Sequence, residues 1–273
     1  MFDRDRLLLI VRRLAICIVL LVALAPVVWL FSIAYKPTRD IFASPPTFLF
    51  TPTLENFESV FRYFKLGALL ESSLIIAIGS TALSLLLGAP AGYALARSES
   101  PRAIWLAYFF LIIRTVPPIA TLIPFYLLMR DIGLLGTWWA VIILNTALNS
   151  AFVVWMMFSF FRTAPVSIEE AARTDGCTDF GAFFRIALPT VVPGLIASAI
   201  FCVMFSWNDF LYAMFLTKAD TKTISVALLS AYGTKDISWG TLGALAHFST
   251  LPIVAMMILL NRYFVQGLTQ GVH

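Results

Sequence analysis

The amino-acid sequence predicts an all-α polytopic membrane protein with six transmembrane helices, and composition is the first observation behind this prediction. Hydrophobic residues make up 60% of the chain and charged residues 12%, about half the charged fraction of a typical soluble domain. The mean hydropathy is +0.89. Such a chain lacks the polar surface that it would need to stay dissolved in water. Long apolar runs favour helices over barrel strands, which would show alternating segments of ~10 residues.

Six apolar runs are long enough to cross a bilayer, which takes ~20 residues of α-helix. Four of them carry no charged residue, namely Leu14 to Tyr35, Ser72 to Ala96, Ile132 to Phe161 and Ile237 to Asn261. Two are interrupted by one charge each, namely Ala103 to Met129 by Arg114 and Ile186 to Thr217 by Asp209. An even number of helices places both termini on the same side of the membrane.

The third apolar run is expected to be kinked or broken. It contains the pair Pro117-Pro118 and then Pro124. Proline lacks a backbone N–H and its ring clashes with the preceding helical turn, so a straight helix through these positions is unfavourable.

The placement of arginines predicts that both termini are cytoplasmic. Basic residues are enriched on the cytoplasmic side, and the first helix usually dominates orientation; Arg12 and Arg13 directly precede that helix. A cleaved signal peptide would place Pro26 directly after the cut, which favours an uncleaved helix. The expected segments are a cytoplasmic N-terminus at 1–13, a first transmembrane helix at 14–35, an extracytoplasmic loop at 36–71 and a cytoplasmic tail at 263–273.

A polar, charge-bearing segment separates the fourth and fifth apolar runs. Pro165 suits the start of a helix, and Glu169 and Glu170 lie near the positive end of its dipole. Gly176 suits the residue that follows a helix end. The segment therefore predicts a helix of about two to three turns, followed by a second helix from Thr178 to Ala187. Composition alone is equally consistent with an amphipathic connector on the membrane surface.

The spacing within this segment resembles a family signature. It reads Glu170-Ala171-Ala172, three residues, Gly176, nine residues, then Ile186-x-Leu188-Pro189. This pattern resembles the EAA loop of binding-protein-dependent ABC importer permeases. The resemblance covers about residues 67–262, and it implies a type I ABC importer transmembrane domain with a coupling loop at 163–189. The implied ATPase-coupling residues are Glu169, Glu170, Ala171, Ala172, Asp175, Gly176, Leu188 and Pro189.

Two further segments narrow the resemblance to carbohydrate importers. Phe205-Ser206-Trp207-Asn208-Asp209-Phe210 looks like the Trp-Asn-Asp segment common in carbohydrate importer permeases. The tail from Arg262 to Val272 is similar to the ending of the maltose-type inner-membrane subunit. The resemblance therefore implies the permease subunit of an ATP-driven importer of a sugar or sugar-like solute.

The resemblance implies that the protein is one subunit of an assembly in the bacterial cytoplasmic (inner) membrane. The expected partners are a second permease, two ATPase subunits, an extracytoplasmic solute-binding protein, a sugar-like substrate and membrane lipid. The resemblance implies no catalytic residue on this chain, and we expect no metal site and no cofactor on it. Consistently, the sequence has no Walker-type Gly-x4-Gly-Lys-Ser/Thr run, so ATP and Mg would belong to the ATPase subunits. The net charge of +4 is small and gives no reason to expect a nucleic-acid partner.

Polar side chains within the apolar runs are candidates for the substrate pathway. A charge at the centre of a membrane helix costs ~2.5–3.5 kcal/mol, so such residues normally face the protein interior or a cavity. The candidates are Arg114, Asn145, Asn149, Trp207, Asn208, Asp209 and His247. Structural interpretations stay open beside this one: Arg114 and Asp209 could form a salt bridge, the two asparagines could join helices, and His247 could be a packed residue.

Two other functions also stay open. An ion-coupled secondary transporter would use Asp209 and His247 as a relay, but this leaves the loop spacing unexplained and the chain shows no convincing internal repeat. A membrane scaffold without transport activity would explain the docking loop but not the kinked and polar spans.

Overall fold

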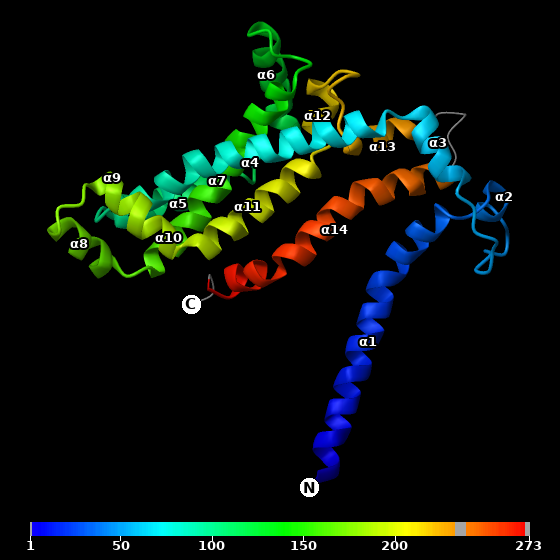
Figure 1. Ribbon diagram of the computed structural model, residues 1–273, viewed down its shortest axis with the longest axis horizontal. Coiled ribbons are helices and arrows are strands. Elements are labelled where there is room, and N and C mark those ends of the chain that lie inside the picture. The colour runs from blue at the N-terminus through cyan, green and yellow to red at the C-terminus, as the bar shows by residue number, and fades with distance from the viewer. Residues whose placement is uncertain (1, 233–238, 271–273) are drawn as a thin grey trace. The chain divides into compact units, whose positions relative to one another are not determined.

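The computed structural model of the protein describes residues 2–232 and 239–270, with side chains described for residues 8–229, 232 and 239–259. All regular elements in these ranges are helical (Figure 1). Four helices are long and apolar enough to cross a membrane, namely Leu8–Ile33, Leu66–Arg97, Trp138–Thr163 and Trp239–Leu259. Two bent helix pairs raise this number to six if each pair is a single span. The prediction of an all-helical chain with several apolar spans is therefore confirmed.

The chain divides into two compact units, Met1–Leu66 with Leu228–Thr250 and Gly67–Ala227 with Leu251–His273, which are described separately. The first contains α1 (Phe2–Ile33), α2 (Thr38–Ile41) and α3 (Glu55–Tyr63). Two helices run from one unit into the other, α13 (Ile224–Ala231) and α14 (Trp239–Gln270). The second contains α4 (Leu66–Arg97), α5 (Pro101–Ile113), α6 (Pro118–Asp131), α7 (Trp138–Thr163), α8 (Val166–Thr174), α9 (Asp179–Ala182), the π-helix η1 (Phe183–Ala187), α10 (Leu188–Thr190), α11 (Val192–Trp207) and α12 (Leu211–Leu216).

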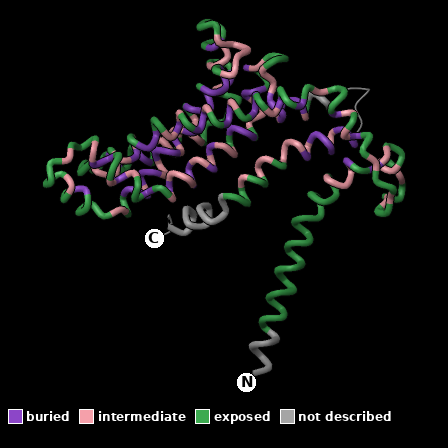
Figure 2. The backbone as a smooth tube through the Cα atoms, in the orientation of Figure 1, coloured by how far each residue is buried: buried purple, intermediate pink, exposed green. Residues whose placement is uncertain are grey.

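In the first unit, a buried asparagine holds the end of α1. The side-chain amide of Asn56, on α3, donates hydrogen bonds of 2.9 Å to the carbonyl oxygens of Ala34 and Lys36. These two carbonyls follow the end of the helix and would otherwise lack partners. The described part of α1 is exposed over residues 8–30 and half-buried over its last three residues, 31–33 (Figure 2).

In the second unit, α7 is the central helix and more of it is buried than of any other long helix (Figure 2). One apolar cluster, around Met129 and Leu144, joins α7 to α4, α6 and α12. Another, around Met157 and Phe161, joins α7 to α4, η1 and α11. The burial explains why the sequence of α7 is apolar on all sides rather than along one stripe.

Two glycines allow α4 to approach α7 closely. A Cβ atom on Gly92 would lie 2.9 Å from the backbone nitrogen of Phe158 and from the carbonyl oxygen of Val154. A Cβ atom on Gly88 would lie 2.7 Å from the side chain of Val153. Small residues at such positions are typical of membrane helices that pack backbone against backbone.

The third apolar run is broken, as the prolines predict. It forms α5 and α6, which meet at an angle of 86°. The break extends from Arg114, the C-terminal cap of α5, to Pro117, the N-terminal cap of α6. Pro118 is the first residue of α6, where its missing N–H leaves no hydrogen bond unmade.

The prediction of one continuous fifth span from Ile186 to Thr217 is wrong. The helical segment Asp179–Thr190 meets α11 at 78°, and α12 starts only at Leu211. The corner coincides with Pro189 and Pro193, each within the first two positions of a helix, where proline ends one helix and starts the next. The expected second helix at 178–187 exists but its later part, Phe183–Ala187, is a π-helix.

The close contact between α4 and α7 predicts opposite effects for two matched substitutions. Gly92→Ala should destabilise the protein by about 1–3 kcal/mol, because the new methyl group meets backbone atoms that cannot move aside. Gly67→Ala, near the start of the same helix, should be neutral or slightly stabilising, because no atom lies within 4 Å of its Cβ position. Thermal unfolding of the purified protein in detergent measures both, and equal midpoints for the two variants would contradict the packing described.

Candidate functional site

The polar loop between α7 and α11 forms the helix that its sequence predicts. Helix α8 runs from Val166 to Thr174 and is preceded by Pro165. At its end the N–H of Cys177 donates to the carbonyl of Ala172, and the N–H of Gly176 donates to that of Arg173, both at 3.0 Å. Gly176 has φ +89°, a conformation that glycine adopts without strain. This pair of bonds is a Schellman motif, which fixes where α8 stops.

Glu169 anchors this helix to the end of α4. Its side chain is 2% exposed, and its carboxylate receives hydrogen bonds from the Arg97 guanidinium at 2.5 Å from Nη2 to Oε1 and 3.1 Å from Nε to Oε2. The hydroxyl of Tyr93 donates to Oε2 at 2.9 Å. We call these three residues the Arg97–Glu169 clamp. Two-point binding of a carboxylate by arginine fixes orientation as well as distance.

The clamp also includes a backbone group of α7. Nη1 of Arg97 donates to the carbonyl oxygen of Phe161 at 2.6 Å, in the last turn of that helix. One guanidinium therefore holds together the ends of α4 and α7 and the start of α8. Arg173 extends this network, since its Nη2 donates to the hydroxyl of Tyr93 at 3.4 Å and its Nε donates to Oδ1 of Asp179, on α9, at 2.8 Å.

The clamp keeps Glu169 ionised despite its burial. Burial by itself raises the pKa of a carboxyl group, but here the hydrogen bonds from Arg97 and Tyr93 and the nearby positive charges outweigh it, so the pKa of Glu169 lies below its ordinary value. An ionised carboxylate is the better acceptor for both donors, which keeps the helix attached at neutral pH.

The predicted coupling residues therefore divide into two groups. Glu169 faces the protein, and Ala172 and Leu188 are half-buried. The others are exposed, namely Glu170, Ala171, Asp175, Gly176 and Pro189. Val166 and Ile168 are also exposed, at 42% and 48%, so α8 presents apolar side chains beside Glu170. The exposed side of α8 is thus both apolar and charged, as docking surfaces often are.

A second polar group occupies the break between α5 and α6. Nη1 of Arg114 lies 3.5 Å from Oδ1 of Asn149, whose Nδ2 donates to Oγ of Ser206 at 2.9 Å. Ser206 Oγ is in turn 2.8 Å from Oγ of Ser80. This chain of polar groups links the break to α7, α11 and α4, and it brings two of the predicted pathway residues together.

The break between α11 and α12 holds three other predicted pathway residues. Asp209 accepts a hydrogen bond from the N–H of Tyr212 at 3.2 Å, so it caps α12. The neighbouring Trp207 is buried, and the Asn208 side chain is exposed and donates to the carbonyl of Met204. Among the described residues, Oδ2 of Asp209 and Nδ2 of Asn145 are buried and lack a hydrogen-bond partner. None of the ion pairs between described residues joins Arg114 to Asp209, so the salt bridge left open as an alternative is not formed.

His247 belongs to the first unit, whereas the other six pathway candidates belong to the second. Its ring packs edge-on against Phe31, Tyr35 and Phe57 at centroid distances of 4.0, 5.5 and 5.5 Å. Nδ1 lies 2.8 Å from the carbonyl oxygen of Gly243 on its own helix. These contacts are those of a packed residue.

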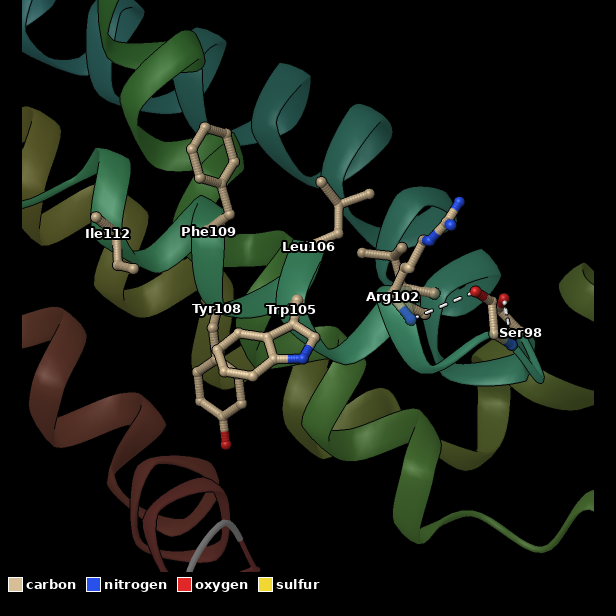
Figure 3. Close-up of a pocket in the computed structure, with 10 residues that line it drawn as sticks. Ser98, Arg102, Trp105, Leu106, Tyr108, Phe109 and Ile112 are labelled. Carbon is tan, nitrogen blue, oxygen red and sulfur yellow. Dashed lines mark hydrogen bonds between the residues drawn. The ribbon is translucent and has the colours of Figure 1, made fainter.

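A groove on the outside of α5 has a cavity volume of about 670 Å³ (Figure 3). Its walls are mostly apolar and aromatic, including Trp105, Leu106 and Phe109, with Arg102 and Ser98 at one end. None of the predicted coupling or pathway residues lines it. The groove is therefore separate from both sites described above.

Sequence reasoning did not identify Arg97, Tyr93, Ser80 or Ser206 as site residues. Arg97 ends an apolar run, which by itself is typical of any membrane helix end. Its partner lies 72 positions further along the chain, so no local spacing connects the two. The only available signal was that both residues border the same side of the predicted membrane.

The family described as "Binding-protein-dependent transport system inner membrane component" matches residues 84–270. These residues make up more than half of the chain and include the whole polar loop. The chain belongs to this family.

Relatives of this inner membrane component align along most of its length. The probable ABC transporter permease protein y4oR of Sinorhizobium fredii is 35% identical over 255 residues, which cover 93% of this chain and 92% of that protein. The trehalose transport system permease protein SugB of Mycobacterium tuberculosis is 34% identical over 256 residues, covering 91% and 92%. The sulfoquinovosyl glycerol transport system permease protein SmoH of Agrobacterium fabrum is 30% identical over 262 residues, covering 95% and 92%.

The fold of the inner membrane component is also known from solved structures. A chain in the crystal structure of a bacterial ABC transporter involved in the import of the acidic polysaccharide alginate matches with a TM-score of 0.78. The match covers 96% of this chain and 98% of that chain at 23% identity. The likeness establishes the fold of an ABC importer membrane subunit.

The burial of the Arg97–Glu169 clamp predicts that substitution of Glu169 lowers the stability of the loop strongly, whereas substitution of the exposed Asp179 lowers it little. Glu169→Ala should cost about 3–5 kcal/mol, because it leaves a largely buried guanidinium without its counter-charge. Asp179→Ala, which breaks an exposed pair in the same loop, should cost about 0–1 kcal/mol. Hydrogen exchange of the amides at 163–189 in the inner membrane component measures both effects; equal protection in the two variants would exclude the anchoring role.

The lowered pKa of Glu169 also predicts a pH dependence. A group whose pKa is depressed on folding contributes stability above its unfolded pKa, and this contribution is lost as the pH falls through the folded pKa. The thermal midpoint of the wild-type protein should therefore exceed that of the variant Glu169→Gln by a constant amount at neutral pH. Below about pH 4.5 the difference between the two midpoints should shrink. A difference that persists unchanged at pH 3 would contradict this assignment.

Proposed function

We propose that this protein is the permease subunit of an ATP-driven importer of sugars or sugar-like solutes and forms half of the translocation pathway. The observation that carries the proposal is α8, which the buried Glu169 holds in place while its other side, with Ile168 and Glu170, is exposed. A short helix that is anchored internally and partly apolar outside is suited to a cleft on a second protein. Membership of the inner membrane component family supports the identity of that protein as an ATPase subunit.

The clamp provides a route by which movement of the ATPase reaches the membrane helices. A displacement of α8 acts on Arg97 at the end of α4 and, through the same guanidinium, on Phe161 in the last turn of α7. The continuing chain through α9, η1 and α10 leads into α11 at the 78° corner. In the proposed cycle, closure of two ATPase subunits draws this loop towards that of a second permease and opens the pathway outward.

The topology proposed for this cycle has six transmembrane crossings with both termini cytoplasmic. The four long helices and the two bent pairs would supply these crossings. The loop at 163–189 must lie in the cytoplasm if ATPase subunits bind it, and this choice fixes the side of every other loop. The first crossing would be 14–35, the extracytoplasmic loop 36–71, the transmembrane domain 67–262, and residues 1–13 and 263–273 would be cytoplasmic.

The sugar assignment rests on two independent supports. Trp207-Asn208-Asp209 resembles a segment common in carbohydrate importer permeases. The printed names of relatives include transport systems for trehalose, sulfoquinovosyl glycerol and diacetylchitobiose. Asn145, Asn149 and Ser206 would offer amide and hydroxyl groups to hydroxyl-rich solutes.

ATP and Mg would be bound and used on the two partner ATPase subunits, and an extracytoplasmic solute-binding protein would deliver the solute. The permease itself would contribute no catalytic residue, cofactor or metal ligand to the cycle.

The alternative of an ion-coupled transporter, with Asp209 and His247 as a relay, gains no support from the structure. His247 packs among aromatic rings, and the carboxylate of Asp209 accepts a hydrogen bond from the first turn of α12.

Purification of the tagged protein from its native membrane tests the proposal. A second permease and two ATPase subunits should purify with it, and ATP hydrolysis should rise when the loaded solute-binding protein is added. Glu170→Ala should reduce this stimulation about tenfold or more, since central contacts of an interface dominate its affinity. Glu99→Ala, an exposed acidic residue outside the loop, is the control. Isolation of the chain without ATPase subunits, or unchanged stimulation in the Glu170 variant, would refute the coupling role.

A further inference from the structure

Arg114 is a membrane-embedded cation without an acidic partner among the described residues. None of the four ion pairs between them involves Arg114, and the only hydrogen bond of its guanidinium to a described residue is to Asn149 at 3.5 Å, the upper limit for such a bond. In these four pairs an arginine of the described residues meets a carboxylate, as Arg97 does. Charges within membrane spans are normally paired, line a cavity or mark a substrate route.

Aromatic rings compensate only part of this charge. The guanidinium of Arg114 lies 3.7 Å from the ring centroid of Phe205 and 5.3 Å from that of Phe152. The attraction of a cation to an aromatic face is weaker than the cost of placing an arginine at a membrane helix centre. Arg114 also caps the carboxyl end of α5, where the helix dipole favours a positive charge, but most of its N–H donors still lack an acceptor among the described residues.

The same rings form a cluster next to the guanidinium. Phe152 on α7 lies 5.4 Å from Phe201 and 5.6 Å from Phe205, both on α11, as measured between ring centroids. Phe205 is 37% exposed, so the cluster reaches the surface beside Arg114. Aromatic faces pack against the C–H groups of sugar rings, and arginine binds carboxylates and sulfonates through paired hydrogen bonds. The two chemistries are adjacent here.

We propose that the solute of this importer is an acidic sugar, whose carboxylate or sulfonate group binds Arg114 while its sugar ring contacts Phe205 and Phe152. This inference rests on the proposed function and adds the charge of the solute to it. The guanidinium at the α5–α6 break is the specificity-determining group, since a neutral sugar leaves it without a counter-charge. Asn149 holds the guanidinium towards the rings and does not neutralise it.

Matched pairs of sugars test the inference in the complete importer. The purified assembly, with its solute-binding protein, is reconstituted in vesicles loaded with ATP, and uptake is measured for glucose against glucuronate, galactose against galacturonate, and glucose against glucose 6-sulfonate. The acidic member of at least one pair should be taken up about tenfold faster or more. Arg114→Gln should abolish this preference by slowing uptake of the acidic sugar alone, and Arg114→Lys should retain part of it.

Arg130→Gln is the control, because Arg130 is exposed and, among the residues whose side chains are described, forms an ion pair with the neighbouring Asp131 alone. ATP-driven uptake restricted to neutral sugars, or wild-type uptake of the acidic sugar by Arg114→Gln, would overturn the inference while leaving the proposed function intact. Absence of ATP-driven uptake of every sugar would overturn both. If Arg114→Gln fails to assemble, the preference of the wild-type importer within each pair decides the matter by itself.

Discussion

The buried ion pair between Arg97 and Glu169 is the interaction on which the arrangement of this loop depends. Burying two charges is tolerated only if each of them makes enough hydrogen bonds. Here Glu169 accepts hydrogen bonds from Arg97 and Tyr93, and Arg97 also donates to the carbonyl oxygen of Phe161. Without the pair, a nine-residue helix such as α8 would be too short to persist alone. The exposed residues that we propose for ATPase coupling are thus positioned by Glu169, which is buried.

The two polar centres of the second unit follow different rules. The clamp at the ends of α4 and α7 is closed, because donors and acceptors balance within the chain. The group around Arg114 is open, because a guanidinium, two rings and an amide converge without a carboxylate among the described residues. A polar group whose donors and acceptors are all satisfied within the chain stabilises one arrangement, whereas a guanidinium with unused donors can still bind a ligand. Both lie where a helix ends or breaks, which is where backbone and side-chain polar groups are free to meet.

Local sequence patterns predicted much of the fold but little of the polar pairing. Composition and run length predicted the apolar helices, Pro117-Pro118 predicted the break at Arg114, and Gly176 predicted the end of α8. The run from Ile186 to Thr217 was predicted as one span because its apolar character continues through the 78° corner before α11 and the break between α11 and α12, and hydropathy does not report the direction of the chain. Contacts such as Arg97 with Glu169 or Ser80 with Ser206 join distant parts of the chain, and only packing brings them together.

The glycine contacts between α4 and α7 have a mechanical consequence. Because Gly88 and Gly92 place no side chain of their own between α4 and α7, this contact has fewer rotamers that could change to absorb a displacement. Arg97 joins the ends of the same two helices, so α4 and α7 are fastened to each other at two places. The chain bends instead at 113–118 and 190–192, by 86° and 78°. In the proposed import cycle we therefore expect α4 and α7 to move together and the two corners to change their angles.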